Sequence, residues 1–357
     1  MLYSFRWRQR DLKLVLNFLF VEESGNQIIG DARVLTADYL PNKMVHRSSE
    51  RQEIARNLEP ILDEEQPNNM LLYGKPGTGK TAMAKYVVQE LQKERFVQSS
   101  YVNCFSEKSR FEIFYELLNE KITTPRDSTS TDKVIEKFEE KTREEPTVVI
   151  VDEVDQISDD EILYELSRFQ NTGMIFIAND QKVFTHFEGR VRSRLSGVKR
   201  IRFKKYSTGE LADILELRRK HGLRDDCVKR SQLKKIGSRA GGDARVALNS
   251  LRFAAREAEN KGFEQITDEV IEEAISDAYD EERLESLESL NRHQKAVYKV
   301  LQERGELQMG ELYEKYRTQV EDAKSKRTLR RYLNKMEAYE VVKSEGDKSA
   351  KTYFLTQ

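Results

Sequence analysis

A glycine-rich loop at residues 74–81 is the feature that most restricts how this chain can fold. Its sequence, Gly-Lys-Pro-Gly-Thr-Gly-Lys-Thr, matches the phosphate-binding pattern G-x-x-x-x-G-K-[ST]. The apolar run Met70–Tyr73 precedes it and an amphipathic stretch follows it, which is the strand–loop–helix context that the pattern requires. In that context the glycines let backbone N–H groups turn toward phosphate oxygens, and the helix directs its positive N-terminal end at the same anions. The nucleotide-binding residues predicted from the loop are Gly74, Lys75, Pro76, Gly77, Thr78, Gly79, Lys80 and Thr81.

Two carboxylates follow a second apolar run, Thr147–Val151. We expect Asp152 to hold Mg²⁺ together with the Thr81 hydroxyl, and Glu153 to orient or polarise the water that attacks the γ-phosphate. Lys80 is expected to reach the β- and γ-phosphates. An acidic pair by itself often caps a strand, so this prediction depends on the P-loop that precedes it. Together the two segments predict ATP and Mg²⁺ as ligands, and an ATPase that releases ADP and phosphate.

Short apolar strands alternate with amphipathic stretches from residue 28 to about residue 206. Short runs rich in valine and isoleucine, separated by helical segments, are typical of a parallel sheet covered on both faces. The runs are Met70–Gly74, Ser99–Cys104, Thr147–Glu153 and Met174–Asp180. We therefore predict an α/β P-loop NTPase core at residues 28–206, with a parallel sheet and helices on both faces.

The strand patterns stop after residue 206. Ser207 and Glu210 have the spacing of a capping box and open an all-helical segment, predicted at residues 207–285. The segment 286–357 has the pattern of three helices followed by two short strands, which is the order of a winged helix-turn-helix. Residues 1–27 are an N-terminal extension of unknown role. Its apolar stretch is too short to span a bilayer, which takes about 20 apolar residues, and we interpret it as a short strand or helix packed on the body.

Composition restricts the environment of the protein more than its activity. The chain has 357 residues, too many for one ordinary core, and its 61 basic and 62 acidic residues give a net charge of −1. A chain that is not a polycation must make any nucleic-acid contact through a local basic patch. Cys104 and Cys227 are far apart and belong to no metal-binding pattern. They indicate reduced cysteines, and we expect a cytoplasmic protein with no membrane partner.

Four further residues complete the predicted ATPase site. Asn179 follows an apolar strand and is a candidate sensor of the γ-phosphate, the alternative being an ordinary turn residue. Arg245 opens a long helix, and its guanidinium could stabilise charge on the γ-phosphoryl group and close the helical segment over ATP. Arg190 or Arg194 could act as an arginine finger in the site of a neighbouring subunit. The alternative for each arginine is a solvated side chain.

Taken together, these residues resemble the AAA+ ATPases and, more narrowly, the archaeal Orc/Cdc-type origin-recognition initiators. The resemblance covers the chain from about residue 28 to its end. It rests on Asp152-Glu153-Val154-Asp155, on Gly242-Asp243-Ala244-Arg245, on Arg190-Val191-Arg192-Ser193, on the leading segment Leu35–Leu62, and on a C-terminal winged helix at about residues 288–357.

The resemblance implies features that the patterns alone do not give. In this family the segment ahead of the P-loop closes over the adenine. The matching positions of this segment are Tyr39, Pro41, His46 and Arg47, and Tyr206 is a further predicted nucleotide-binding residue. We interpret His46 itself as structural. The family also inserts a DNA-contacting helix after its second strand, and residues 106–122, with Lys108 and Arg110, match that insertion, although the same stretch is also compatible with a plain surface helix.

The third helix of the C-terminal segment is strongly basic. No acidic residue occurs between Lys324 and Met336, and apolar residues recur along it at helical spacing, so it packs on one side and presents cations on the other. Residues 288–357 hold 15 Lys and Arg against 11 Asp and Glu, in a chain whose total charge is −1. This pattern favours a recognition helix in the major groove, with phosphate contacts from the hairpin. A solvated helix and a protein-binding winged helix are the alternatives. The predicted DNA-binding residues are Lys326, Arg327, Arg330, Arg331, Lys335, Lys348 and Lys351.

Two functions are compatible with these patterns. The first is an ATP-dependent, nucleoid-associated replication initiator that binds double-stranded DNA at origin repeats and recruits or loads an MCM-type replicative helicase. In it, ATP is a conformational switch with slow hydrolysis, and paralogous initiator subunits are further expected partners. The second is an ATP-sensing DNA-binding regulator of transcription or plasmid copy number. A clamp loader is disfavoured, because such proteins end in a helical collar rather than a winged helix.

Overall fold

The computed structural model describes most of the chain. It covers residues 27–63, 65–104, 108–118, 129–157, 159–288, 290–339, 341–346 and 351–356. The expected N-terminal extension therefore lies outside the described residues, apart from Gln27.

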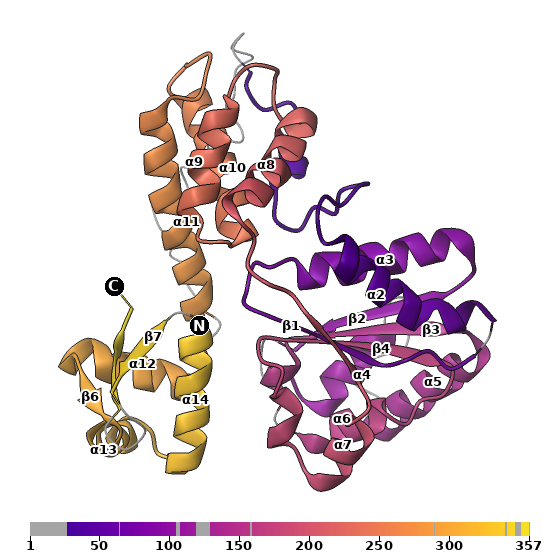
Figure 1. Cartoon of the computed structure of the whole chain (residues 1–357). Coiled ribbons are helices and arrows are strands. Elements are labelled where there is room, and N and C mark those ends of the chain that lie inside the picture. Colours follow the sequence, from indigo (N-terminus) through magenta and orange to yellow (C-terminus); the bar gives the residue numbers. More distant parts are fainter. Residues whose placement is uncertain are drawn as a thin grey trace, which may run out of the picture.

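A five-stranded parallel sheet forms the centre of the nucleotide-binding unit (Figure 1). In spatial order its strands are β2 (Gln98–Asn103), β3 (Thr147–Asp152), β4 (Thr172–Ala178), β1 (Met70–Tyr73) and β5 (Lys199–Arg202). Every residue of β3 and β4 is buried, so these strands lie in the middle of the sheet between two helical layers. The helices of this unit are α2 (Ser48–Leu58), α3 (Lys80–Glu94), α4 (Arg110–Leu118), α5 (Thr131–Glu144), α6 (Asp160–Leu166) and α7 (Gly189–Arg194).

Alternation along the strands divides the unit into two apolar cores. Val149 and Val151 of β3 face the core that α4, α5 and α6 cover. Val148 and Ile150 face the opposite core, which α2 and α3 cover. Successive side chains of a strand point to opposite faces of the sheet, so a continuous apolar run is required where both faces are covered. The predicted α/β core with helices on both faces is therefore confirmed.

An all-helical lid follows the sheet. It consists of α8 (Thr208–Gly222), α9 (Arg230–Arg239), α10 (Ala244–Asn260) and α11 (Asp268–Glu288). The capping box predicted at Ser207 and Glu210 is present at the start of α8. Asp243 caps α10, because its carboxylate accepts hydrogen bonds from the N–H groups of Arg245 and Val246. The lid buries its own apolar core, separate from the two cores of the sheet.

The start of the described chain differs from the predicted boundary at residue 28. Ile28 and Leu35 are buried in the core of the lid and not against the sheet. The N–H groups of Ile28 and Ile29 donate to the Glu259 carboxylate at 2.8 and 2.7 Å, and the N–H of Gly30 donates to a carbonyl at the end of α8. Residues 28–35 therefore belong to the lid, although the nucleotide-binding unit separates them from it in sequence.

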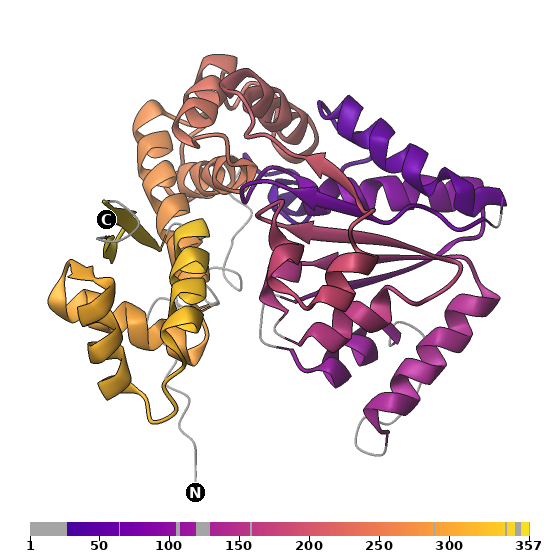
Figure 2. The same cartoon turned by 60° about the horizontal axis from the view of Figure 1, so that its bottom comes forward.

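The C-terminal unit has the order of a winged helix. Its elements are α12 (Arg292–Arg304), β6 (Leu307–Gln308), α13 (Met309–Gln319), α14 (Lys326–Ala338), β7 (Val342–Glu345) and β8 (Thr352–Leu355). The strands form an antiparallel sheet in the order β6-β8-β7. The two-residue strand β6 was not expected from sequence, because so short a strand has no periodicity. Long helix α11 joins the lid to this unit, and α14 lies on the side of the unit that faces the nucleotide-binding unit (Figures 1 and 2).

Within the part of the chain that the structure describes, no helix has both the length and the apolar character that crossing a membrane requires.

Candidate functional site

The P-loop connects β1 to α3, as the sequence predicts. Gly77 and Gly79 have φ angles of 65° and 85°, a region that residues with a Cβ atom rarely occupy. A Cβ on Gly77 would lie 1.8 Å from a carboxylate oxygen of Asp243, and one on Gly79 would lie 2.5 Å from the Tyr206 hydroxyl. Glycine is therefore required both for the turn of the loop and for the close approach of the lid.

Lysine and threonine side chains hold the loop from inside. Lys80 is buried, and its ammonium donates hydrogen bonds to the carbonyls of Gly74 at 2.7 Å and Lys75 at 3.0 Å. The Thr78 hydroxyl donates to the carbonyl of Lys75 at 2.8 Å. Burial lowers the pKa of Lys80, while the carboxylates of Glu153 and Asp152 act in the opposite direction. The loop thus holds one ammonium group at the N-terminus of α3, where both the lysine and the helix attract phosphate.

Thr81 and Asp152 meet across the site. The Thr81 hydroxyl donates to Oδ2 of Asp152 at 2.6 Å, which brings two hard oxygen ligands together at the end of β3. The same Oδ2 accepts a hydrogen bond from the Tyr101 hydroxyl at 3.3 Å. Tyr101 was not predicted, although its place in β2, paired in register with Ile150 of β3, would have suggested it once the strand order was known.

Glu153 has an unusual backbone conformation. Its φ of 54° lies in the left-handed region, where a non-glycine residue is uncommon and strained. Its Oε2 accepts a long hydrogen bond from the Asn179 amide at 3.4 Å. Burial, together with the neighbouring carboxylates Asp155 and Asp152, raises the pKa of Glu153 to about 7, although Lys80 and the Tyr339 hydroxyl act in the opposite direction. Glu153 and Asn179 therefore lie close together beside the P-loop, the arrangement expected of a water-orienting acid and its sensor.

Tyr339, from the C-terminal unit, also contacts Glu153. Its hydroxyl donates to Oε2 of Glu153 at 3.0 Å and accepts a hydrogen bond from the Gln156 amide. Burial raises the pKa of Tyr339 well above its usual range, so the hydroxyl stays protonated and acts as the donor. Nothing in the sequence around Tyr339 pointed to this contact.

The lid is closed on the P-loop through the start of α10. The N–H of Ala244 donates to the carbonyl of Gly77 at 2.9 Å, next to the close approach of Asp243. Arg245 forms an ion pair with Glu282 of α11, and a longer one with Asp243 at 3.7 Å. Burial raises the pKa of Glu282 to about 7, and the Arg245 charge opposes that rise. Glu282 is a partner of Arg245 that the sequence did not reveal.

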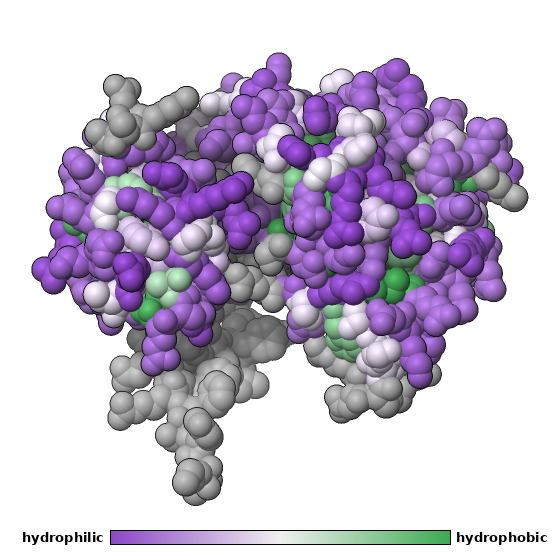
Figure 3. All heavy atoms as spheres, turned by 90° about the horizontal axis from the view of Figure 1, so that it is seen from below, coloured by the Kyte–Doolittle hydropathy of each residue, from purple (hydrophilic) through white to green (hydrophobic). Residues whose placement is uncertain are grey.

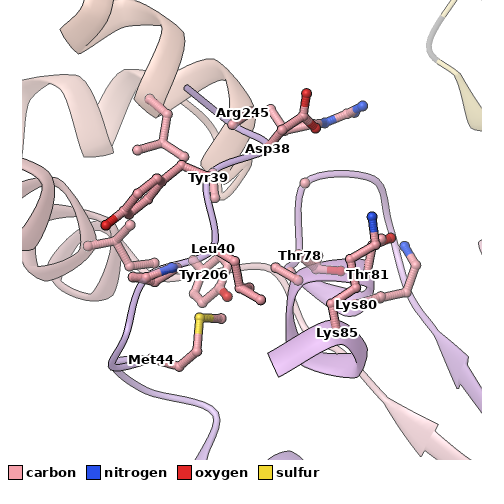
Figure 4. Close-up of a pocket in the computed structure, with 18 of the residues that line it drawn as sticks. Asp38, Tyr39, Leu40, Met44, Thr78, Lys80, Thr81, Lys85, Tyr206 and Arg245 are labelled. Atoms are coloured by element: carbon pink, nitrogen blue, oxygen red, sulfur yellow. The ribbon is translucent and has the colours of Figure 1, made fainter. Parts of the chain in front are cut away.

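A cavity of about 330 Å³ lies between the P-loop and the lid (Figure 4). The segment before α2 forms one wall, with Tyr39, Leu40 and Met44, and Tyr206 lies beneath the loop (Figure 4). Arg218 supports this wall, because its guanidinium lies 4.9 Å from the Tyr39 ring centre and donates to two backbone carbonyls. The lining is apolar beside a basic, glycine-rich floor, which suits a flat base joined to phosphates.

Two of the predicted adenine-side residues lie outside this lining. Pro41 lines the cavity with Tyr39 and Tyr206, but His46 and Arg47 do not. His46 contacts Asp213 at 3.0 Å, in keeping with a structural role. Arg47 stacks over the Tyr206 ring at 4.1 Å and forms an ion pair with Glu50 at 3.1 Å. Arg47 therefore supports the cavity from behind Tyr206.

Comparison with known proteins identifies the family. The sequence matches the AAA domain family over residues 62–184 and the Cdc6 AAA+ ATPase-type lid domain over residues 212–276. It is 38% identical over 335 residues to ORC1-type DNA replication protein 9 of Halobacterium salinarum, covering 92% of this chain and 94% of that protein. The chain belongs to the ORC1-type DNA replication protein family. This ORC1-type protein is an AAA+ ATPase with a nucleotide-binding site.

Solved structures share the fold of the ORC1-type chain. The Aeropyrum pernix ORC1 protein, determined in complex with DNA, matches with a TM-score of 0.73 and 26% identity over 94% of this chain and 95% of that one. The Aeropyrum pernix ORC2 protein, determined as ADPNP–ADP complexes, matches with a TM-score of 0.65 and 21% identity over 92% of this chain and 94% of that one.

The basic residues of α14 in the ORC1-type protein fall into two groups. Lys326, Arg327, Arg330 and Arg331 are exposed, and none of them forms an ion pair with a described residue. Lys335 is partly buried and lines a second cavity, of about 870 Å³, between the C-terminal unit, the lid and the P-loop. Lys351, which lies outside α14 and directly before β8, forms an ion pair with Glu337 of α14 at 3.5 Å. The predicted contact at Lys348 lies outside the described residues.

The other predicted arginines and lysines are engaged with carboxylates or rings. Lys108 is paired with Glu116, and Arg110 with Glu165. Arg190 is paired with Glu161 at 2.7 Å. Arg190 and Arg194 both lie on α7 against one ring, that of Tyr164, at 4.9 and 5.2 Å from its centre. Neither of these two arginines lines the nucleotide cavity of its own chain.

Proposed function

We propose that this chain is an ATP-dependent replication initiator that binds double-stranded origin DNA through its C-terminal unit and recruits or loads an MCM-type replicative helicase. Family membership supports a role in replication, because curated relatives are named DNA replication proteins. The DNA complex of the Aeropyrum pernix ORC1 protein supports the DNA-binding part of the proposal. The helicase partner is inferred from the proposed role as a replication initiator.

The observation that carries the proposal is the cationic face of α14, which we define as Lys326, Arg327, Arg330 and Arg331. These side chains are exposed on a helix whose opposite side, Leu329, Leu333 and Met336, is fully buried. The helix is thus fixed by packing while its cations face solvent. The face of the molecule shown in Figure 3 is mostly hydrophilic. A packed helix with projecting arginines can enter the major groove and contact phosphates and base edges.

The nucleotide site supplies the switch. Lys80 and the amides of the P-loop would bind the phosphates, and Thr81 and Asp152 are the oxygen ligands that fit Mg²⁺. Mg²⁺ would neutralise charge on the phosphate oxygens when bound. Glu153 would accept a proton from the attacking water, with Asn179 holding its carboxylate. Because the lid contacts the loop through Ala244 and Asp243, the presence of ATP changes how the lid is held, and the expected turnover is slow.

Two further roles concern arginines and lysines outside the nucleotide cavity. Arg190 and Arg194 on α7 are proposed to reach the nucleotide of a neighbouring initiator subunit, because they do not line their own site. Lys108 and Arg110 are proposed as a minor second DNA contact. Their charges are already compensated by Glu116 and Glu165, so they contribute less than the cationic face of α14.

The proposal is tested by footprinting the full-length protein on the genomic DNA of its own organism, combined with helicase capture. Protection of a repeated sequence near one replication origin, together with capture of the MCM-type helicase, is the expected result. Protection at many promoters without helicase capture would replace this proposal with a regulator of transcription or copy number.

A further inference from the structure

The C-terminal end of α14 touches the catalytic apparatus. Tyr339 is the C-cap residue that directly follows this helix, and its hydroxyl lies 3.0 Å from Oε2 of Glu153. The hydroxyl is also fixed from the other side, because the Gln156 amide donates to it. Tyr339 therefore donates its only hydroxyl proton to Glu153. Gln156, which lies about one turn after the end of β3, holds the hydroxyl in that orientation.

This contact occupies one of the two carboxylate oxygens of Glu153, the predicted proton acceptor. Each carboxylate oxygen offers about two acceptor positions. Oε2 of Glu153 accepts from the Asn179 amide at 3.4 Å and from Tyr339 at 3.0 Å. A water molecule that is to lose a proton to Oε2 must displace one of these donors.

The contact is placed where it can be broken without unfolding a core. The cavity of about 870 Å³ opens directly beside it and is lined by Glu153, Lys335 and Tyr339. The apolar core of the C-terminal unit contains no residue of the nucleotide-binding unit. Moving the end of α14 away from Glu153 therefore breaks polar contacts next to an open space and exposes no shared apolar core.

The same helix carries the cationic face at its other end. Lys326 begins α14 and Ala338 ends it, so at 1.5 Å per residue the two ends are about 20 Å apart on one rigid element. Any displacement of Arg327, Arg330 and Arg331 also displaces Tyr339, because an α-helix of this length moves as a rigid unit. No hinge residue lies between them, since the segment from Lys326 to Ala338 contains neither glycine nor proline.

We propose that Tyr339 is a positioning residue that restrains Glu153 and keeps ATP hydrolysis slow until DNA displaces the end of α14. The restraint itself depends only on the Tyr339–Glu153 contact. Its release by DNA rests on the proposed function of α14. ATP is cleaved by the same reaction in both states, and only the rate of turnover differs between them.

The first experiment compares Tyr339→Phe with Tyr298→Phe in the full chain without DNA. Tyr298 is a partly buried tyrosine of the same unit that packs on its apolar core, so its variant controls for the loss of a tyrosine hydroxyl. Tyr339→Phe is expected to raise kcat for ATP about tenfold with an unchanged KM, since a hydrogen bond to a charged group is removed from the resting state only. Circular dichroism and thermal melts check that both variants fold. An unchanged or lower kcat in folded Tyr339→Phe protein overturns the inference.

The second experiment adds a mixed-sequence DNA duplex at low salt and measures binding by fluorescence anisotropy alongside kcat. The wild type and Tyr298→Phe should be stimulated by DNA, whereas Tyr339→Phe should already be fast and gain little. Equal stimulation of all three proteins overturns the coupling between DNA and Tyr339. Absence of DNA binding in the anisotropy measurement overturns the proposed function and the release by DNA, and leaves the result without DNA as an independent measure of the restraint.

Discussion

The nucleotide cavity and the cationic face of α14 are built in opposite ways. The cavity is lined by residues from the sheet, the P-loop, the lid and the segment before α2, and its Lys80, Thr81 and Asp152 side chains already form hydrogen bonds within the chain. The cationic face comes from a single helix, and its charges have no ion-pair partner among the described residues. One site is organised before its ligand arrives, while the other holds exposed charge that a polyanion can neutralise.

This difference determines how each site should respond to mutation. In the cavity, one lost side chain leaves buried partners unsatisfied, so single substitutions have large effects. On the cationic face each charge acts almost independently and in water, so effects are smaller, additive and sensitive to salt. The two sites should therefore be separable by mutation.

Lys80→Ala should produce the largest effect. Removing the ammonium that is proposed to bind two phosphates would cost two charge-assisted hydrogen bonds, so ATP affinity should fall about 1,000-fold. Isothermal titration calorimetry measures this, with Lys93→Ala as the control because Lys93 is exposed on the same helix. DNA affinity measured without nucleotide should not change. A parallel loss of DNA binding would contradict the separation of the two sites.

Glu153→Gln should retain ATP affinity and reduce kcat about 100-fold, because the amide cannot accept a proton from water. Steady-state phosphate release gives kcat and KM, and nucleotide titration confirms that ATP still binds. Unchanged hydrolysis would remove Glu153 from the role proposed for it.

Arg330→Ala combined with Arg331→Ala should weaken DNA binding about tenfold and leave ATP affinity unchanged. Because each arginine is expected to neutralise one phosphate, the dependence of log K on log salt should become shallower by about two. Fluorescence anisotropy over a salt series provides both quantities. Lys295→Ala combined with Lys299→Ala makes the same charge change on exposed positions of α12 and should leave the salt dependence as in the wild type.

Lys108→Ala should have the smallest effect on DNA binding, less than about twofold, because Glu116 already compensates its charge. The same anisotropy assay applies. A loss as large as that of the α14 double variant would mean that DNA separates the Lys108–Glu116 pair and that the insertion is a principal contact.

The parts of the site that form one continuous stretch could be predicted from sequence. The P-loop and the Asp152-Glu153 pair each lie where a strand ends, so local pattern alone places their side chains. The cationic face of α14 was also visible, because helical spacing separates its charges from its apolar stripe. The fold class followed from the alternation of apolar runs and amphipathic stretches.

Residues that reach the site from another unit could not be predicted. Tyr339 and Glu153 are 186 residues apart, and no local pattern distinguishes Tyr339 from other tyrosines of the C-terminal unit. Glu282 lies in an acidic stretch of α11 in which several carboxylates look equivalent in sequence, and only the packing of α10 against α11 selects it as the partner of Arg245. Periodicity identifies which residues are buried but does not say which core receives them, and so it missed that Ile28 belongs to the lid.

The placement of residues 28–35 in the lid has a consequence for biosynthesis. Ile28 and Ile29 depend on Glu259 for their hydrogen bonds, and Ile28 is fully buried among lid residues. On the ribosome this segment emerges more than two hundred residues before its partner. The nucleotide-binding unit, which lies between them, can therefore fold early as an inserted body while the lid waits for both of its halves. A nascent chain halted before α10 should carry a folded sheet and an unprotected leading segment, which makes that segment a natural site for chaperone or protease action during synthesis.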